Sequence, residues 1–406
     1  MKIKTLNALF AAGIAGFFSL STQAAFTLPA TGYVQYGDAQ SYSLPALAYA
    51  TDPAHPGPGN PYYVVSTPGA IKDLIVVATG ADGGPVNTNF AGMDNAYATP
   101  NGSGPTFFST TNTADPGQVG GNFTGDNANT WDATAGSLRS FLQTGSSFED
   151  MIFFFNNNQT NSGGQATQSL AAWALVQVWD YNGNPNNPTL LGTFEFANKV
   201  ASNSAGGMYR PIVEGGGGLF NGNVNTFTSD NTSGGPNQTS ARDPNAGTNL
   251  QTDYVLSGGA LCLTSAGVLV GCGATLPPGV TIVQQFDHNL GANQAAYAIV
   301  FPELNALLTS LFNTKTSTQL DKITMSVDLR LGCDPASTTA PGFGDPTTNV
   351  CTGEGWGYGR EINNGYEQVF IGKASTVTNV PEPATLGLLG LGLLSLGLAR
   401  RRRRAA

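Results

Sequence analysis

Three oxygen-bearing side chains occupy one turn of the sequence at a spacing that calcium ligands use. Asp180, Asn182 and Asn184 offer a carboxylate and two amide oxygens at the first, third and fifth positions of a loop. An EF-hand calcium loop also needs Gly at its sixth position and Glu at its twelfth, where this chain has Pro185 and Leu191. A calcium site of another kind and an ordinary Asx turn therefore both fit these residues.

Asp and Asn are combined in the same way in two other turns, Asp126-Asn127 and Asp230-Asn231. Such pairs form Asx turns without any ion, because the side chain accepts a hydrogen bond from the backbone two residues further on. Apart from the calcium hypothesis, we predict no cofactor and no metal site.

Trp356 and Tyr358 alternate with glycine in the segment 353–360. Aromatic rings on a bare backbone are suited to stacking on sugar rings, and they are equally suited to closing the edge of a core. The glycines do not form a nucleotide-binding loop, because neither a helical pattern nor a lysine follows them.

The sequence offers few groups for catalysis. His55 and His288 are its two histidines, and neither an HExxH nor a GxSxG motif occurs. Glycoside hydrolysis needs only two carboxyl groups a few ångströms apart. The pairs that could supply them are Glu149 with Asp150, Asp180 with Glu195, and Glu354 with Glu361. We predict a protein that is not an enzyme, and the alternative is a secreted carbohydrate-active hydrolase with paired carboxylates.

Four cysteines in an exported chain indicate two disulfides. Cys262 and Cys272 flank a hairpin pattern centred on Ala266-Gly267, which would place the two cysteines opposite each other, and Cys333 and Cys351 bracket a turn-rich loop. The local spacing favours the pairs Cys262–Cys272 and Cys333–Cys351, although three connectivities exist for four cysteines.

The first residues have the pattern of an export signal. Lys2 and Lys4 precede an uncharged apolar run from Leu6 to Leu20, and small residues before the expected cleavage site place it after Ala24 or one residue later. We therefore expect residues 1–24 to be a signal peptide that signal peptidase removes outside the cytoplasm.

The last residues combine three features in a fixed order. Val380, Pro381, Glu382 and Pro383 are followed by the uncharged run 384–399 and then by five arginines. The arginines are Arg400, Arg401, Arg402, Arg403 and Arg404. A helix of sixteen residues rises about 24 Å, slightly less than a bilayer core of about 30 Å. In lipid the backbone must satisfy its own hydrogen bonds, so we expect a transmembrane helix with the arginines at its cytoplasmic end.

This arrangement resembles the PEP-CTERM sorting signal of Gram-negative bacteria. In that family the Pro-Glu-Pro motif, the membrane segment and the Arg-rich end are recognised by an exosortase, an integral-membrane cysteine protease. The resemblance covers about residues 379–406. It implies a transient hold in the inner membrane, followed by cleavage near Val380–Pro383 and delivery to the cell surface or the extracellular space.

Removal of both ends leaves a strongly acidic body. The full chain has 17 basic and 26 acidic residues, and the ends take seven basic residues and Glu382 with them. The body keeps 10 basic and 25 acidic residues, a net charge of −15. Such a body repels nucleic acid, so we expect no nucleic-acid partner.

Short apolar runs separated by Gly/Asn-rich segments indicate a mainly β body. We expect strands at 71–79, 106–109, 150–155, 171–180, 190–196, 254–256, 280–286, 295–301, 322–331 and 366–371. Segment 171–180 also fits a helix, but its Val and Trp content and the following Asn-Gly turn favour a strand paired with 190–196. Helices are expected at 135–143 and from Pro302 onward. Segment 84–132 is expected to be a long loop.

The pattern as a whole predicts a β-sandwich or jelly-roll-like body at 25–372 with one or two short helices. A domain boundary near 202–252 and a single domain with a long loop both fit this body. A polar stalk at 373–379 and the sorting tail at 380–406 follow. The function that we predict is that of an exported surface or extracellular-matrix protein, associated with exopolysaccharide.

Overall fold

The computed structural model describes most of the body of the chain. It describes residues 26–30, 32–80, 89–100, 107–111, 113–158, 169–196, 228–229, 252–253, 255–258, 261–271, 276–332, 362 and 367–375. The expected signal peptide, the sorting tail and most of the segment 202–252 lie outside these residues. Among the helices that the structure describes, none is long and apolar enough to cross a bilayer.

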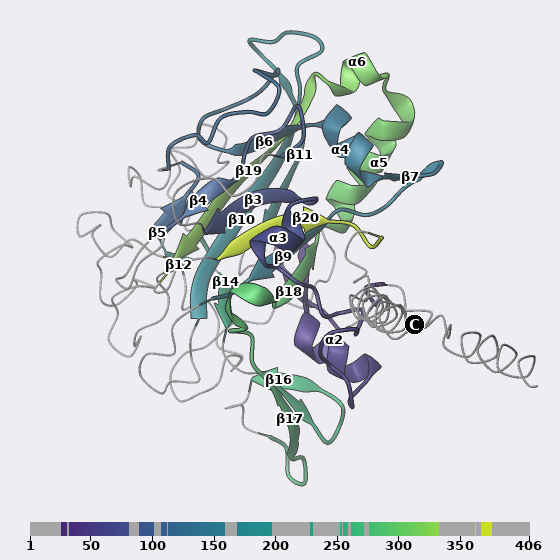
Figure 1. Cartoon of the computed structure of the whole chain (residues 1–406), viewed down its shortest axis with the longest axis vertical. Helices are drawn as coiled ribbons and strands as arrows, with labels where there is room; N and C mark the ends of the chain where they lie inside the picture. Colours follow the sequence, from purple (N-terminus) through teal and green to yellow (C-terminus); the bar gives the residue numbers. More distant parts are fainter. Residues whose placement is uncertain are drawn as a thin grey trace, which may run out of the picture.

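A seven-stranded sheet forms one layer of the body (Figure 1). In spatial order its strands are β1 (Val34–Tyr36), β2 (Ala39–Ser43), β18 (Tyr297–Val300), β9 (Ile152–Asn156), β20 (Gln368–Gly372), β3 (Ile75–Gly80) and β4 (Tyr97–Thr99). Neighbouring strands are antiparallel except β3 and β4, which are parallel. β3 and β9 read as continuous apolar runs because both faces of this sheet are buried.

The second large sheet is built on two long central strands. Its path is β11 (Thr189–Phe196), β10 (Ser169–Asp180), β19 (Ile323–Gly332) and β5 (Phe107–Ser109). β14 (Val255–Gly258) also pairs with β10, and β6 (Trp131–Thr134) with β19. β10 and β11 form the hairpin that the Asn-Gly turn predicts.

Both large sheets contribute to one apolar core. Val77 of β3 and Phe153 of β9 belong to the same buried cluster as Trp173 of β10 and Met325 of β19. The other face of the seven-stranded sheet, with Phe154, packs in a second cluster under α2 (Leu44–Thr51) and α3 (Pro68–Ile71). The expectation of a mainly β body with few short helices is confirmed. The parallel pair of β3 and β4 distinguishes this body from a sandwich of purely antiparallel sheets.

Three helices gather at one end of the body, as Figure 1 shows. They are α4 (Ala135–Leu142), α5 (Pro302–Thr314) and α6 (Ser317–Leu320). The helices predicted at 135–143 and from Pro302 are confirmed. Thr134 caps α4 by accepting a hydrogen bond from the Ser137 amide, and Pro302 begins α5 because proline is suited to a first helical position.

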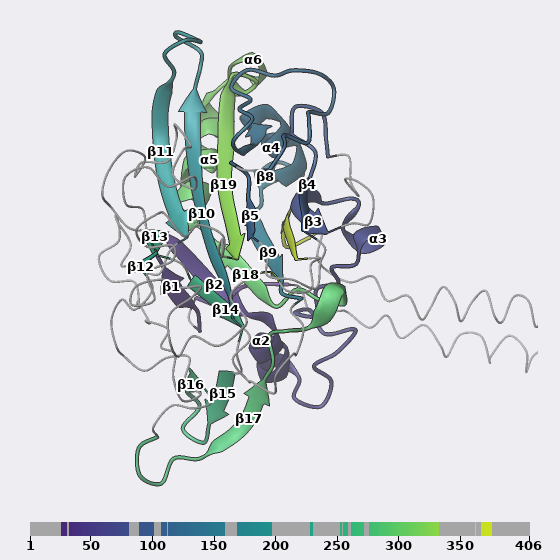
Figure 2. The same cartoon turned by 90° about the vertical axis from the view of Figure 1, so that its left-hand side faces the viewer.

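A small sheet lies at the opposite end, away from the large sheets in both Figure 1 and Figure 2. It contains β16 (Leu269–Gly271), β15 (Leu261–Thr264) and β17 (Ile282–Phe286). The predicted hairpin is present, but its register places Val270, not Cys272, opposite Cys262. The turn closes one residue earlier than expected, because the Gly267 amide donates to the Thr264 carbonyl. Cys262 is not a free thiol, and its pairing with Cys272 stays a prediction because Cys272 lies outside the described residues.

Short elements complete the described fold. They are the pairs β7 (Gln143–Thr144) with β8 (Ser147–Phe148) and β12 (Thr228–Ser229) with β13 (Thr252–Asp253), and the 3-10 turn η2 (Gly291–Asn293).

Two sequence expectations need correction, and one alternating strand is buried on both faces. The strand expected at 71–79 begins only at Ile75, because Pro68 starts a helical turn that ends at Ile71. β19 alternates apolar and polar residues, yet all ten are buried, because parts of the expected loop 84–132 cover its polar side. The stalk expected from Lys373 is docked as far as Ser375, since the Lys373 ammonium donates to the Gln143 carbonyl at 3.0 Å and the Ser375 amide donates to Glu149 at 2.8 Å.

Candidate metal centre

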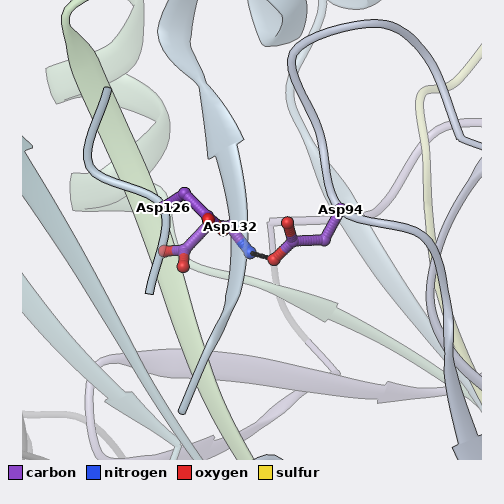
Figure 3. A group of neighbouring side chains, drawn as sticks. All are labelled: Asp94, Asp126 and Asp132. Atoms are coloured by element: carbon purple, nitrogen blue, oxygen red, sulfur yellow. Dashed lines mark hydrogen bonds between the residues drawn. The ribbon is translucent and has the colours of Figure 1, made fainter. Parts of the chain in front are cut away.

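Three aspartates from separate segments meet beside β6. Asp94 lies between β3 and β4, Asp126 lies in the turn before β6, and Asp132 is on β6. One carboxylate oxygen from each lies within 4.8 Å of those of the other two. Figure 3 shows Asp94 extending toward Asp132 and Asp126 from its own segment. This is the arrangement of charged oxygens that can hold a hard cation.

Backbone hydrogen bonds fix two of these aspartates against each other. The Asp132 amide donates to Asp94 Oδ2 at 2.6 Å, and the Asp94 amide donates to the Asp132 carbonyl at 2.9 Å. Asp132 Oδ2 in turn accepts from the Asn127 amide at 2.8 Å and from Thr130 Oγ1 at 2.9 Å. The positions of the two carboxylates are therefore set by the fold of the chain around them.

Asp126 is held more loosely at the edge of the cluster. Gln118 donates its side-chain amide to Asp126 Oδ2, and Gln118 also forms a β-bridge with Asp94. The second oxygens of Asp94 and Asp126, both named Oδ1, are buried and have no hydrogen-bond partner among the described residues. Two acceptor atoms in the cluster are thus unsatisfied by protein groups.

The local charge is negative. Burial of Asp94, which is 1% exposed, together with the Asp132 carboxylate raises its pKa from 3.8 to about 9. The hydrogen bond from the Asp132 amide opposes this shift, and Asp126 and Asp115 add to it. Burial and the same four carboxylates also raise the pKa of Tyr97. The charged groups that raise the pKa of Asp94 are therefore all carboxylates.

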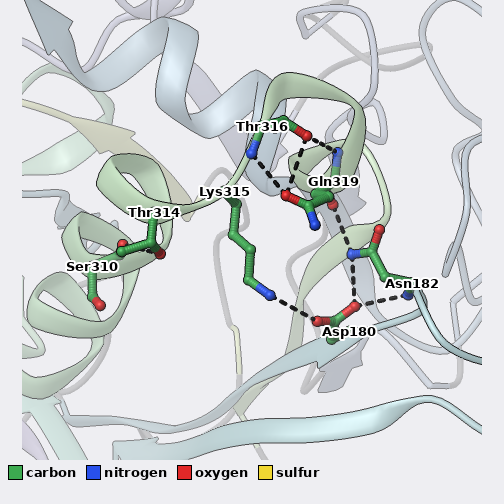
Figure 4. A network of polar contacts seen from close by, with 7 residues as sticks. All are labelled: Asp180, Asn182, Ser310, Thr314, Lys315, Thr316 and Gln319. Atoms are coloured by element: carbon green, nitrogen blue, oxygen red, sulfur yellow. Dashed lines mark hydrogen bonds and ion pairs between the residues drawn. The ribbon is translucent and has the colours of Figure 1, made fainter.

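The turn predicted to hold calcium is organised differently. Asp180 Oδ1 accepts from the amide of Asn182 at 2.8 Å and from its side-chain nitrogen at 2.7 Å (Figure 4). Asp180 Oδ2 lies 3.7 Å from the Lys315 ammonium. Asn184 Oδ1 accepts from the Asn186 amide at 3.0 Å in a separate, exposed turn. Both turns have the hydrogen bonds of ordinary Asx turns, and the cation that the structure places beside Asp180 is the Lys315 ammonium. Calcium binding at this turn stays a prediction.

The two histidines differ in their surroundings. His288 is fully buried, with Nε2 at 2.7 Å from Ser43 Oγ, and its ring is stacked on Tyr297 at 4.8 Å. Ser43 is the N-cap of α2, because its hydroxyl accepts from the Ala46 amide. His55 is exposed and lies beside Asp52 at 3.1 Å. His288, which follows the end of β17, thus contacts the residue that caps α2.

The carboxylates of the named pair Asp180 and Glu195 do not converge. Glu195 faces Leu175 across the β10–β11 ladder, five positions from Asp180, which is about 17 Å along the strand. Glycosidase carboxylates are about 5 to 9.5 Å apart. Glu149 binds Ser375 and Thr144, and Asp150 beside it is exposed. Glu354 and Glu361 lie outside the described residues.

Other predicted site residues also lie outside the described part of the chain. They are the stacking candidates Trp356 and Tyr358, the cysteines Cys272, Cys333 and Cys351, the sorting motif Val380–Pro383 and the arginines Arg400–Arg404.

The sequence contains only part of the signal for the three-aspartate cluster. Asp126-Asn127 is recognisable as an oxygen-rich turn, whereas Asp94 and Asp132 are isolated acids in weakly patterned segments. Asp94 is 38 positions from Asp132, so only the pairing of their segments brings them together.

Comparison with known families separates the body from the tail. Residues 379–404 match the PEP-CTERM protein-sorting motif, which confirms the resemblance and marks an exported protein sorted by exosortase. No curated protein and no solved structure matches the chain. Residues 26–330 match a second model, described as a domain of unknown function (DUF8239). Since this match spans more than half of the chain, the protein belongs to the DUF8239 family and carries a PEP-CTERM sorting tail.

Proposed function

We propose that the mature body is a surface or extracellular-matrix component that associates with exopolysaccharide and is not an enzyme. The observation that carries the proposal is the PEP-CTERM motif at 379–404, which addresses an exported precursor to exosortase. The acidic β body in front of it supports a role outside the cytoplasm and away from nucleic acid.

The proposed route has two cleavages. Signal peptidase removes residues 1–24, and the run 384–399 then holds the folding body at the inner membrane with Arg400–Arg404 on the cytoplasmic side. Exosortase cuts near Val380–Pro383 and releases the body to the cell surface or the medium. The docking of Lys373 and Ser375 onto Glu149 supports a body that extends at least to Ser375, ahead of the proposed cut.

Sorting is tested by the mass of the mature protein in a host with exosortase and in the same host without it. We expect a C-terminus near Val380–Pro383 only when exosortase is present. The control is Glu382→Gln, which leaves the apolar run and the arginines intact and should block the cut. The same C-terminus in both hosts would contradict the proposal.

Polysaccharide association is tested by co-sedimentation of the released protein with exopolysaccharide from its host. We expect Trp356→Ala with Tyr358→Ala to weaken binding about tenfold, because stacking requires the ring faces. Trp356→Phe keeps a ring and is the matched control. No binding by the wild-type protein, with or without calcium, would overturn this part of the proposal.

One observation supports the hydrolase alternative. Asp94 and Asp132 form a close carboxyl pair, and a raised pKa such as that of Asp94 is what a general acid requires. However, Asp94 is 1% exposed, so a sugar would reach it only after the covering segments open. Release of reducing ends from exopolysaccharide, lost in Asp94→Asn, would favour this alternative over the non-enzymatic function.

A further inference from the structure

We propose that Asp94, Asp126 and Asp132 bind one divalent cation, calcium by preference, which ties three segments of the body together. Calcium–oxygen distances are about 2.3 to 2.6 Å, so two ligands of one ion lie at most about 5 Å apart. The three carboxylates meet this condition, since their oxygens lie within 4.8 Å of one another.

Unsatisfied oxygen atoms point to a missing ligand. Asp94 is 1% exposed, and its Oδ1 is buried without a hydrogen-bond partner in the described part of the chain. Its side chain is directed at the other two aspartates (Figure 3). Asp126 Oδ1 is a second buried oxygen to which no described group donates a hydrogen bond. Burying a carboxylate oxygen without a partner is costly, and one cation between the side chains would satisfy both atoms.

No protein cation performs this task within the described residues. Neither Asp94 nor Asp126 forms an ion pair with a described lysine or arginine. By contrast, the buried Asp328 is paired with Arg330 at 3.0 Å. The fold therefore supplies a counter-charge to another buried carboxylate and leaves Asp94 and Asp126 without one among the described side chains.

The donor atoms select the kind of ion. All three side chains offer hard carboxylate oxygens, which calcium and magnesium prefer, whereas zinc sites usually contain nitrogen or sulfur. Magnesium demands near-ideal octahedral geometry and keeps several waters, while calcium accepts irregular cages made of protein groups. A cluster enclosed by backbone turns, with Asp94 and Asp132 fully buried, fits calcium better.

The position of the site implies a structural role for the ion. Asp126 lies in the turn that begins at Thr124, and the Thr124 carbonyl accepts a hydrogen bond from Thr324 of β19. Asp94 precedes β4 of the first sheet, and Asp132 is on β6 of the second. An ion shared by the three aspartates joins the covering turn to both large sheets.

The test is thermal unfolding of the full-length protein in detergent, after treatment with EDTA and dialysis. With 10 mM calcium, at about 100 times the dissociation constant of a weak extracellular site, we expect the Tm to rise by about 5 °C. Magnesium should produce a smaller rise, and EDTA should reverse both. Asp126→Asn and Asp132→Asn should each lose the calcium-induced rise.

Asp126→Asn is the decisive variant, because Asp126 is only partly buried and an asparagine oxygen can still accept from Gln118. Asp180→Asn is the matched control at the other oxygen-rich turn and should keep the full rise. If Asp132→Asn fails to fold, calorimetric titration of wild type against Asp126→Asn decides, with one site expected to disappear. No rise in the wild-type protein, an unchanged rise in Asp126→Asn, or a loss in Asp180→Asn would each overturn the proposal.

Discussion

The guanidinium carbon of Arg330 lies 4.4 Å from the ring centroid of Trp173, its cross-strand partner between β19 and β10. Both side chains are fully buried. Arg330 also donates to Asp328 on the same strand at 3.0 Å, and Trp173 donates its indole N–H to Glu195 at 2.8 Å. Charged and aromatic groups are thus linked across the second sheet, and their loss should be costly.

Replacing Asp328 with alanine should destabilise the fold by about 3 to 5 kcal/mol, because the change removes a buried carboxylate partner of the Arg330 charge. Lys315→Ala breaks the pair with Asp180, in which the lysine is 33% exposed, and should cost below about 1 kcal/mol. Urea unfolding of both variants measures the difference. Equal costs would show that burial of the Asp328–Arg330 pair does not matter.

Ser43→Ala should lower the free energy of unfolding by about 2 to 3 kcal/mol. The change removes the N-cap of α2, worth about 1 kcal/mol, and also the hydrogen bond to the buried His288. Thr316→Ala removes the exposed cap of α6 and should cost about 1 kcal/mol. Chemical denaturation compares the two, and a smaller loss for Ser43→Ala would contradict the role of His288.

Gly125→Ala should destabilise the covering turn by about 2 to 4 kcal/mol. Its φ is +88°, and an added Cβ would collide with Tyr181 and Thr324. Gly117 has a similar φ of +75° but open space around it, so Gly117→Ala should cost only about 1 kcal/mol. Thermal unfolding measures the Tm of both variants. Equal Tm values for Gly125→Ala and Gly117→Ala would refute the predicted collision.

Docking of the segment 373–375 should depend on pH through Glu149. Burial by itself raises the pKa of Glu149, but hydrogen bonds from Ser375 and Thr144 and the Lys373 ammonium outweigh burial and hold the pKa below 4.5. A lowered pKa gives stability that is present above the unfolded value and is lost as the pH falls through the folded one.

The corresponding measurement compares the wild-type protein with Glu149→Gln, which cannot ionise. We expect the wild type to be the more stable at pH 7 and the two to converge as the pH falls below the lowered pKa of Glu149. A difference that is independent of pH would exclude ionisation of Glu149 as the source of the docking.

Local sequence patterns were sufficient for most of the regular elements. The run at Ile152–Phe155, the β10–β11 hairpin with its Asn-Gly turn and the helix after Pro302 were predictable, because periodicity and turn residues act over a few neighbours. The predicted export signal and the sorting tail are also local patterns. Within the tail, the order of the Pro-Glu-Pro motif, the apolar run and the arginines is sufficient to recognise the PEP-CTERM motif.

The tertiary structure alone decided which polar residues are buried and which acids meet. Thr324, Asp328 and Arg330 look solvent-facing in the alternation of β19, but two long-range hydrogen bonds enclose that side: Thr324 donates to the Thr124 carbonyl, and Thr110 donates to Asp328. Asp94 and Asp132 are 38 positions apart in the sequence, and they come together because their segments pair in the fold. Contacts of this kind depend on strand order and register, which the spacing of residues in one sequence does not encode.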